Sequence, residues 1–458
     1  MRASRRQFLK TCSLMSIAGA ASPFALNLAA IGAASAQAVS GYKALVCLFF
    51  YGGNDHTNTF VPYDLASYGE YSASRSSIAL PRDAALAATA TGPVASQGGR
   101  EFAFNPALTA FKSHWDAGRL AVVANVGPLV VPTTKAQYQN RSVPLPPKLF
   151  SHNDQQAVWQ AYRPIGEGAN IGWGGRIGDL LAGQNANALF TCISAGGSSV
   201  FLSGVNVLQY QVGSSGPTSI SGISGTIYGS GTAASTAYRS LITGTSPNLI
   251  ENELRVVTNR SITANQQLAA ALPAASTLVP AIPANNNLAS QLGVIARIIA
   301  ARTTLGSNRQ VFLVSIGGFD SHDFLLTQHA QQLTLVDAAV GAFYSWLEQL
   351  GVQNDVTLFT ASDFGRTLTS NGDGSDHGWG SHHFVLGGSV VGRDIYGFFS
   401  PTVFGSSVDI GQGNLVPGIA VDQYAATFAR FLGVSDTDMP LVLPNIVNFS
   451  PRYVGLLP

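Results

Sequence analysis

The fold is decided by one stretch of sequence, Val311-Phe312-Leu313-Val314-Ser315-Ile316-Gly317-Gly318-Phe319-Asp320-Ser321-His322. Its first six residues form an apolar run that is typical of a strand buried on both faces of a parallel sheet. Two glycines end the run, and an acid and an imidazole follow. In open α/β sheets, ligands bind beyond the carboxyl ends of the strands. The stretch therefore predicts an α/β fold with a polar site at this edge of the sheet.

A second strand with the same kind of exit follows about forty residues later. The apolar run at residues 355–360 leads into Ser362-Asp363-Phe364-Gly365-Arg366 and then into Asp376-His377-Gly378-Trp379-Gly380-Ser381-His382-His383. A long helical pattern near residues 327–350 lies between the two runs. Strand, helix and strand at this spacing predict a βαβ unit, and hence a parallel sheet.

A third strand is predicted at residues 42–50, near the start of the chain. It ends in Gly52-Gly53-Asn54-Asp55, and these polar side chains are either site residues or ordinary turn formers. Further along, Ser151 stands at or just before a predicted helix start. It is either a helix cap, or part of a site where the positive end of the helix dipole favours an anionic nucleophile or a bound phosphate-like group.

The composition limits the number of domains and the kinds of partner that we expect. The chain has 458 residues, of which 46% are hydrophobic and 11% charged, with a formal net charge of +1. This is enough for a large core in one elaborate α/β domain or two smaller ones. The near-zero charge and the absence of a basic arm give no reason to expect nucleic acid as a partner. From residue 195 to about 249 the composition shifts to Gly, Ser and Thr. This shift predicts an insertion of loops and short strands, extending over residues 195–287 of a single domain at 39–458.

The N-terminus predicts export. Ser4-Arg5-Arg6-Gln7-Phe8-Leu9-Lys10 has every element of a twin-arginine motif, and a mild apolar stretch and small residues suited to cleavage follow it. The alternative is an ordinary amphipathic helix. We expect residues 1–38 to be a signal peptide, the twin-arginine translocase to be a partner during export, and the mature protein to be periplasmic or secreted. No later stretch is long and apolar enough to predict a membrane span.

Acid and imidazole side chains at the strand exits predict a metal site. The candidates are Asp320, His322, Asp363, Asp376, His377, His382 and His383, which exceed what one ion uses. Mixed carboxylate and imidazole ligands suit zinc or manganese, and two such ions can clamp the oxygens of a phosphoryl or sulfuryl transfer. Single residues have simpler explanations: Asp363 could cap a helix that begins at Arg366, and one of the adjacent histidines could pack in the core.

Taken together, these motifs resemble one large family. Gly-Gly-Asn-Asp-x-x-Asn, Ser-His-x-x-x-Gln, Gly-Phe-Asp-Ser-His, Ser-Asp-Phe-Gly-Arg-Thr and Asp-His-Gly-Trp-Gly are similar to motifs of the exported bacterial domain-of-unknown-function 1501 family. That family is itself similar to the alkaline phosphatase and sulfatase superfamily. The resemblance implies a three-layer α/β sandwich with a mostly parallel sheet, and a two-metal site with a Ser or Thr nucleophile.

The same resemblance implies roles for individual residues. Asp320, His322 and His377 are similar to the ligands of one ion, and Asp363 to a ligand of the other, shared with Asp55 and the nucleophile candidate Ser151. Arg366 is expected to hold an anionic substrate group or to cap a helix.

Two departures from the family pattern bear on the number of ions. Phe364 stands where the phosphatase pattern has an imidazole, and Asp320 and His322 are two residues apart rather than four. Either His382 or His383 supplies the missing ligand, or the site holds one ion.

The function expected from these residues is hydrolysis of small anionic esters of phosphate or sulfate by an exported metalloenzyme. Neither Cys47 nor Cys192 lies in the Cys-x-Pro-x-Arg pattern of formylglycine sulfatases, and no Gly-x-Ser-x-Gly elbow of a serine hydrolase occurs. The alternative is a non-catalytic secreted or envelope protein that keeps the fold for binding or assembly.

Overall fold

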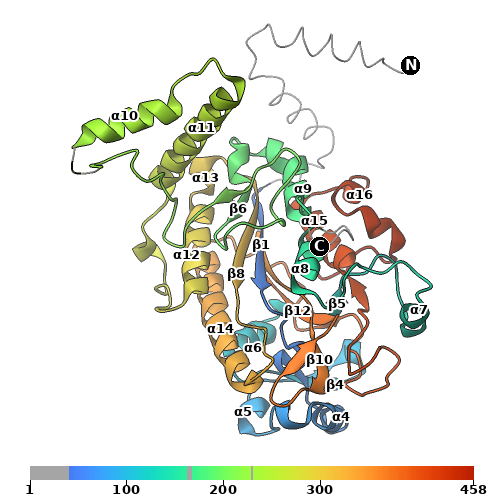
Figure 1. Cartoon of the computed structure of the whole chain (residues 1–458). Coiled ribbons are helices and arrows are strands. Elements are labelled where there is room, and N and C mark those ends of the chain that lie inside the picture. Colours follow the sequence, from blue (N-terminus) through green and yellow to red (C-terminus); the bar gives the residue numbers. More distant parts are fainter. Residues whose placement is uncertain (1–40, 162–167, 228, 230) are drawn as a thin grey trace, which may run out of the picture.

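A central mixed β-sheet organises the chain (Figure 1). The structure is a computed structural model that describes residues 41–161, 168–227, 229 and 231–458, so the predicted signal peptide at residues 1–38 lies outside the described residues. The strand order in the sheet is β13-β5-β12-β9-β1-β8-β6-β7, with β14 also paired to β5. Its strands are β1 (Lys43–Phe50), β5 (Leu120–Gly127), β6 (Cys192–Ser194), β7 (Tyr210–Gln211), β8 (Arg309–Ile316), β9 (Val356–Ser362), β12 (Ser381–Leu386), β13 (Ile395–Tyr396) and β14 (Ile419–Ala420).

The three strands predicted from the sequence lie together at the centre of this sheet. Strand β1 pairs in parallel with β8 on one side and with β9 on the other, so Leu48 lies opposite both Val314 and Thr360. The connection from β8 to β9 runs through helix α14 (Leu325–Gln349), which confirms the predicted strand–helix–strand unit. Strand β12 runs antiparallel to both β5 and β9, so the sheet is mostly but not wholly parallel.

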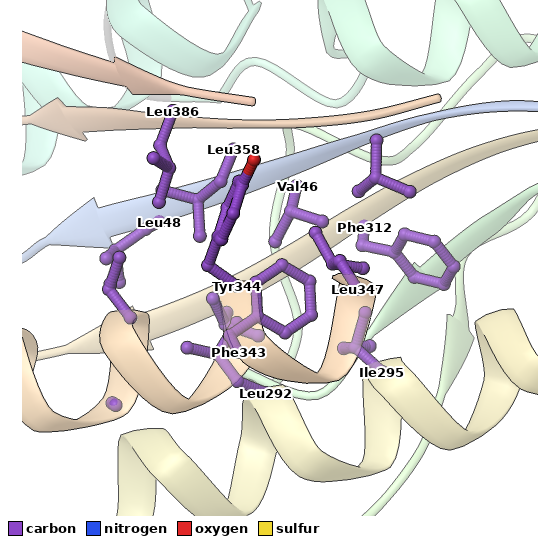
Figure 2. Close-up of a cluster of buried hydrophobic side chains, with 14 of the residues drawn as sticks. Val46, Leu48, Leu292, Ile295, Phe312, Phe343, Tyr344, Leu347, Leu358 and Leu386 are labelled. Atoms are coloured by element: carbon purple, nitrogen blue, oxygen red, sulfur yellow. The ribbon is translucent and has the colours of Figure 1, made fainter. Parts of the chain in front are cut away.

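Helices cover both faces of the sheet, in keeping with the two-sided burial of its strands. Helices α6 (Thr109–Asp116), α12 (Asn287–Ala300) and α14 contribute side chains to one core, and α9 (Trp173–Leu181) and α15 (Val421–Leu432) contribute to the other. Side chains of β1 alternate between the two, with Val46 and Leu48 in the first core and Leu45 and Cys47 in the second. Figure 2 shows the first core, where Val46 and Phe312 face Leu292 and Phe343. The result is an α/β fold whose central strands are held rigidly from both sides.

Smaller elements surround the sheet. Strands β2 (Phe60–Pro62), β3 (Ala90–Val94) and β4 (Arg100–Phe104) form a second sheet, and β10 (Arg366–Ser370) pairs antiparallel with β11 (Ser375–His377). Further helices are α3 (His56–Thr59), α4 (Leu65–Arg75), α5 (Ala84–Ala87), α7 (Lys135–Asn140), α8 (His152–Ala161), α13 (Arg302–Leu305) and α16 (Met439–Val442). The hairpin of β10 and β11 carries the segment from Arg366 to His377 back over the end of the central sheet.

The Gly/Ser/Thr-rich segment differs from its prediction. Residues 195–249 were expected to form loops and short strands, but helix α10 occupies Thr232–Thr243 and α11 runs from Leu249 to Ala271. The prediction was wrong there because the average composition hid a run without glycine or proline, Thr-Ala-Ala-Ser-Thr-Ala-Tyr-Arg-Ser-Leu-Ile-Thr, that can form a helix. Among the described residues, no helix has the length and apolar character needed to cross a membrane.

Candidate metal centre

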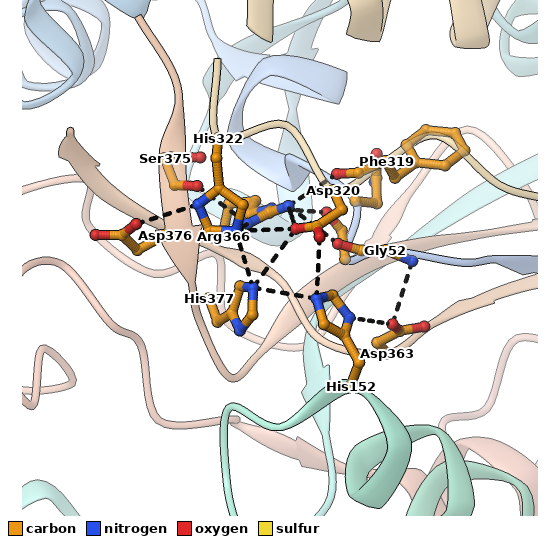
Figure 3. A network of polar contacts seen from close by, with 12 residues as sticks. Gly52, His152, Phe319, Asp320, His322, Asp363, Arg366, Ser375, Asp376 and His377 are labelled. Atoms are coloured by element: carbon orange, nitrogen blue, oxygen red, sulfur yellow. Dashed lines mark hydrogen bonds and ion pairs between the residues drawn. The ribbon is translucent and has the colours of Figure 1, made fainter. Parts of the chain in front are cut away.

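Side chains from four separate parts of the chain converge beyond the carboxyl ends of β8 and β9 (Figure 3). Asp320 and His322 lie on the loop after β8, and Asp363 directly follows β9. His377 ends strand β11, and His152 is the first residue of α8. His152, Asp320 and His377 each place one ligand atom within 4.8 Å of the others. This arrangement could hold a metal ion.

The spacing of the donor atoms fits one ion. Nε2 of His377 lies 3.1 Å from Nε2 of His152 and 3.1 Å from Nε2 of His322. Carboxylate oxygens of Asp320 lie 3.3, 3.0 and 3.5 Å from Nε2 of His152, His322 and His377. In a tetrahedral zinc site with Zn–N of about 2.0–2.1 Å, donor atoms are about 3.3–3.4 Å apart. The observed separations lie around that value.

In each of the three imidazoles, Nδ1, the ring nitrogen that faces away from the cluster, lies close to an oxygen atom. Nδ1 of His152 lies 2.7 Å from Asp363 Oδ2, Nδ1 of His377 lies 2.7 Å from the carbonyl oxygen of Phe150, and Nδ1 of His322 lies 3.3 Å from Asp376 Oδ1. Carboxylate and carbonyl oxygens only accept hydrogen bonds, so we assign the proton of each neutral ring to Nδ1. Oxygen partners of this kind orient the histidine ligands of metal sites and fix their tautomer.

This assignment leaves lone pairs facing one another. With Nδ1 protonated, the Nε2 atoms of His152 and His377 are both acceptors at 3.1 Å, and the Asp320 carboxylate adds a third acceptor beside them. Such a cluster is stable only if a cation lies among the acceptors or one ring takes a second proton. The donor set therefore fits a divalent ion, with nitrogen and oxygen ligands that suit zinc.

The pKa shifts differ among the three candidate ligands. The hydrogen bond from His152 to Asp363 raises the pKa of that imidazole above its ordinary value, and the charges of Asp363 and Asp320 add to the effect. Burial raises the pKa of Asp320, but the hydrogen bond and charge of Arg366 outweigh it and hold the pKa below its ordinary value. Burial lowers the pKa of His377, which keeps that ring neutral and able to act as a ligand.

Arg366 ties the loops of the site together. Its guanidinium is buried and pairs with Asp320. It also donates to four backbone oxygens, those of Gly52, Gly53, Phe319 and Ser375. With its donors engaged in this way, the side chain holds Asp320 in place and does not project into solvent. Arg366 begins strand β10, so it does not enter a helix for Asp363 to cap.

The chain packs closely behind the site. Gly52 has φ +115° and donates its N–H to Asp363 Oδ2 at 3.2 Å, and a Cβ there would lie 2.4 Å from the backbone nitrogen of Asp320. Only glycine permits both that conformation and that approach. Phe364 packs its ring against His152 and His377, with centroids 4.8 and 4.6 Å apart. The residue that replaces the expected imidazole thus forms an apolar wall beside the ligand set.

Asp55 lies elsewhere. Its carboxylate is buried and pairs with the buried guanidinium of Arg75, while Oδ1 accepts a hydrogen bond from Thr57 at 3.0 Å. The structure therefore gives Asp55 an arginine partner and does not bring it into the cluster of His152, Asp320 and His377.

The adjacent histidines His382 and His383 are also not brought into the cluster. His382 is buried, accepts a hydrogen bond from the N–H of Asn125 at 3.0 Å and packs on Phe399. His383 is buried against Trp159 and Tyr424. Neither imidazole forms an ion pair within residues 41–161, 168–227 and 231–458.

Ser151 lies next to the candidate ligand His152, with its side chain turned to the helix. Its Oγ donates to Asp154 Oδ2 at 2.8 Å, and its carbonyl accepts from the N–H of Gln155 at 2.9 Å. The hydroxyl is thus a donor to a buried carboxylate.

His152 is the residue that the sequence reasoning missed as a ligand. It was noticed only as the neighbour of Ser151, because a histidine after a helix-start serine has no spacing rule of its own. The available signal was the Ser-His-x-x-x-Gln pattern: Gln156 is four residues after His152, and its Nε2 donates to the same Asp363 Oδ2 at 2.9 Å. Two residues one helical turn apart that share a partner are a sign of a built site.

The family resemblance was tested against known proteins. Residues 240–439 match the model of a family described as "Protein of unknown function (DUF1501)". This match spans less than half of the chain. The matched residues contain Asp320, His322, Asp363, Arg366 and His377, and His152 lies before them. The resemblance inferred from the motifs is therefore confirmed for this part of the chain. No curated protein matches the sequence.

Solved structures show distant similarity. The lipoteichoic acid synthase LtaP from Listeria monocytogenes matches with 9% identity and a TM-score of 0.37, over 93% of this chain and 81% of that one. The C-terminal periplasmic domain of EptC from Escherichia coli matches with 10% identity and a TM-score of 0.34, over 92% and 88%. A 2-O GAG sulfatase matches with 6% identity and a TM-score of 0.33, over 88% and 74%.

Proposed function

We propose that this protein is an exported, divalent-metal-dependent hydrolase of phosphate or sulfate esters. The observation that carries the proposal is the convergence of Nε2 of His152, Nε2 of His377 and the Asp320 carboxylate within 4.8 Å of one another, with Nδ1 of both rings held by an oxygen. The ester substrates follow from the motif resemblance to the alkaline phosphatase and sulfatase superfamily.

The electrostatics support one ion, with zinc before manganese. In the resemblance, Asp55 and Asp363 would help to hold a second ion. Here Asp55 is paired with Arg75, and Oδ2 of Asp363 accepts from His152, Gln156 and Gly52, while Oδ1 of Asp363 is buried without a hydrogen-bond partner among the described residues. Two buried guanidinium groups, Arg75 and Arg366, thus supply positive charge beside the buried carboxylates.

Different residues of the chain would bind the ion, attack the ester and position the ligands. His152, His377 and Asp320 would hold the ion, and His322 stands at the open side, with its side chain 42% exposed. A bound divalent ion supplies a Lewis acid that stabilises charge on an ester oxygen. Ser151 is the proposed nucleophile and attacks the phosphorus or sulfur atom, its proton passing to Asp154, with which it already forms a hydrogen bond. The bond from phosphorus or sulfur to the ester oxygen breaks, and that oxygen takes the proton from Asp154 and leaves as the alcohol. Water then attacks the seryl ester and gives one proton to Asp154, the phosphate or sulfate leaves, and the Ser151 hydroxyl is restored by that proton. Arg366 positions Asp320 and does not contact the substrate.

The test combines metal analysis with an ester screen. Folded mature protein should contain one zinc ion per chain and should hydrolyse para-nitrophenyl phosphate or sulfate in a manner that chelator abolishes and zinc restores. Ser151→Ala should keep the ion and lose turnover. Full turnover by this variant would remove Ser151 from the mechanism, and a chain that binds no divalent ion would remove the hydrolase proposal itself.

A second candidate function has one observation in its favour. His322 Nε2 lies 3.0 Å from Asp320 and 3.1 Å from His377, so a rotation of this side chain away from Arg366 Nη1, which lies 3.4 Å from the same atom, would bring a fourth ligand and close a tetrahedral shell. A closed site is structural, which fits the non-catalytic secreted or envelope protein. Metal content of one ion with no ester turnover, together with weaker ion binding in His322→Ala, would favour this candidate.

Export through the twin-arginine route is part of the proposal. It rests on Arg5 and Arg6 within the N-terminal motif. Replacing both with lysine should retain the full-length precursor in the cytoplasm, and unchanged export of the variant would contradict it.

A further inference from the structure

Helices α10 and α11 form an antiparallel hairpin that projects from the α/β body (Figure 1). Large apolar side chains on it face solvent, with exposed fractions of 87% for Leu249, 84% for Ile250, 66% for Leu254 and 65% for Leu241. The buried residues of α11 lie in its second half, at Ile262, Ala264 and Leu268. Contiguous exposed apolar surface of this kind marks an interaction site.

The apolar residues on α11 have the spacing of a helix–helix seam. Ile250, Leu254 and Val257 are separated by four and then three residues, so they lie on one side of the helix. This is the spacing of the d and a positions of a heptad, which pack against a second helix. Val257 is 42% exposed, so the stripe stays open along its length.

Two opposite charges flank the stripe on one edge. In the same heptad, Glu253 and Arg260 both occupy g positions, seven residues apart. Both are exposed, and within the described part of the chain neither forms an ion pair, whereas Glu251 pairs with Arg255 on the same helix at 2.5 Å. When two such helices pack antiparallel, g positions of one face g positions of the other.

The charges of Glu253 and Arg260 favour a second copy of the same chain as the partner. An antiparallel copy of α11 would place Leu254 against Val257 of the partner subunit and Glu253 beside Arg260 of the partner subunit, and two-fold symmetry would repeat both contacts. The edge thus complements itself. It is less suited to an anionic membrane, because acidic and basic residues are mixed along it.

Helix α10 widens the apolar surface. A groove of about 280 Å³ runs between the two helices and is lined by Tyr238, Leu241 and Leu254, among others. Because it adjoins the α11 stripe at Leu254, side chains of a second helix packed on the stripe can reach it.

We propose that the hairpin is a homodimer interface in which α11 packs antiparallel against α11 of a second copy. The apolar stripe and the groove supply the buried surface, and the two Glu253–Arg260 contacts fix the direction and register of the helices. The interface lies on an element separate from the metal centre.

Charge reversal tests the register, with sedimentation velocity of the metal-loaded mature protein as the measurement. Glu253→Arg alone and Arg260→Glu alone should each shift the protein toward monomer, because each variant sets like charges opposite one another. The combined variant E253R/R260E should restore the dimer. Both single variants keep a folded hairpin, because the two side chains are exposed, and circular dichroism checks this.

Leu254→Glu tests the apolar seam and should give monomer in the same measurement. Wild-type protein that stays monomeric up to its solubility limit would overturn the proposal, as would a dimer that Leu254→Glu leaves unchanged. Flotation of monomeric wild-type protein with neutral or anionic vesicles would assign the hairpin to a membrane surface instead. Ester turnover is not used in any of these measurements, so their outcome is independent of the proposed function.

Discussion

Two groups of histidines lie at the same end of the sheet and differ in everything but residue type. His152, His322 and His377 are partly exposed, turn Nε2 toward one another, and have Nδ1 anchored on an oxygen. His329, His382 and His383 are buried, and their partners are hydroxyl, amide and aromatic groups. A histidine that binds a metal needs one ring nitrogen held by a hydrogen-bond partner and the other ring nitrogen free to face the ion. Of these two groups, only the first has this arrangement.

The largest expected effect separates the two groups by metal content. His377→Ala removes the Nε2 atom that lies next to the other two imidazoles, so the protein should lose its ion and all metal-dependent turnover. His383→Phe should keep one ion per chain, because it replaces a buried ring packed between Trp159 and Tyr424 with another of similar size. Metal analysis after gel filtration is the measurement. Loss of the ion in His383→Phe with retention in His377→Ala would reverse the comparison.

A smaller effect is expected from the anchor of one ligand. Asp363→Asn can present its amide N–H to His152 Nδ1, which favours the wrong tautomer and weakens ion binding. Loss of such a partner typically costs about 10–100-fold in metal affinity. Competition with a chromophoric chelator measures the affinity.

Asp376→Asn is the matched control for that experiment. Asp376 anchors His322 at a longer distance and is 54% exposed, so water can replace it and the affinity should fall less. Equal losses for the two variants would show that the two anchors act alike.

The sequence predicted the sheet centre and part of this site, for a physical reason. A strand buried on both faces must be apolar throughout, and the polar residue that follows it is then conspicuous, which is how β1, β8 and β9 and the residues Asp320 and Asp363 were found. The other parts depend on packing. Nothing local distinguishes His382 on β12, which turns into the core, from His377 on β11, which turns to the cluster.

The sequence also does not show which cation pairs with a buried carboxylate. Asp55 has the sequence context of a ligand, and only the fold shows that Arg75, twenty residues later on α4, takes its charge. Helix α10 was missed for a different reason: a window average over the Gly/Ser-rich segment conceals a helix of twelve residues.

The smallest expected effect concerns acid stability, and here His152 and the buried histidines shift their pKa in opposite directions. Burial lowers the pKa of His329 to about 4 and the pKa of His382 and His383 to about 3. Between the ordinary value of 6.5 and these values the unfolded chain binds more protons than the folded one. Stability is therefore full above about pH 6.5 and is lost as the pH falls toward 3 to 4, by at most about 1.4 kcal/mol per pH unit for each histidine.

His152 behaves in the opposite way in metal-free protein, because its pKa is raised by Asp363. Its contribution to stability is complete below the ordinary value and is lost as the pH rises through the folded pKa. Chemical denaturation of chelated protein across pH 4 to 7 separates the groups. His383→Phe should reduce the slope of unfolding free energy against pH over this range, since one proton fewer is taken up on unfolding, whereas His152→Gln should not reduce it. An unchanged slope in His383→Phe would mean that this imidazole is already protonated in the folded protein, and the distinction between buried neutral histidines and anchored ligand histidines would then fail.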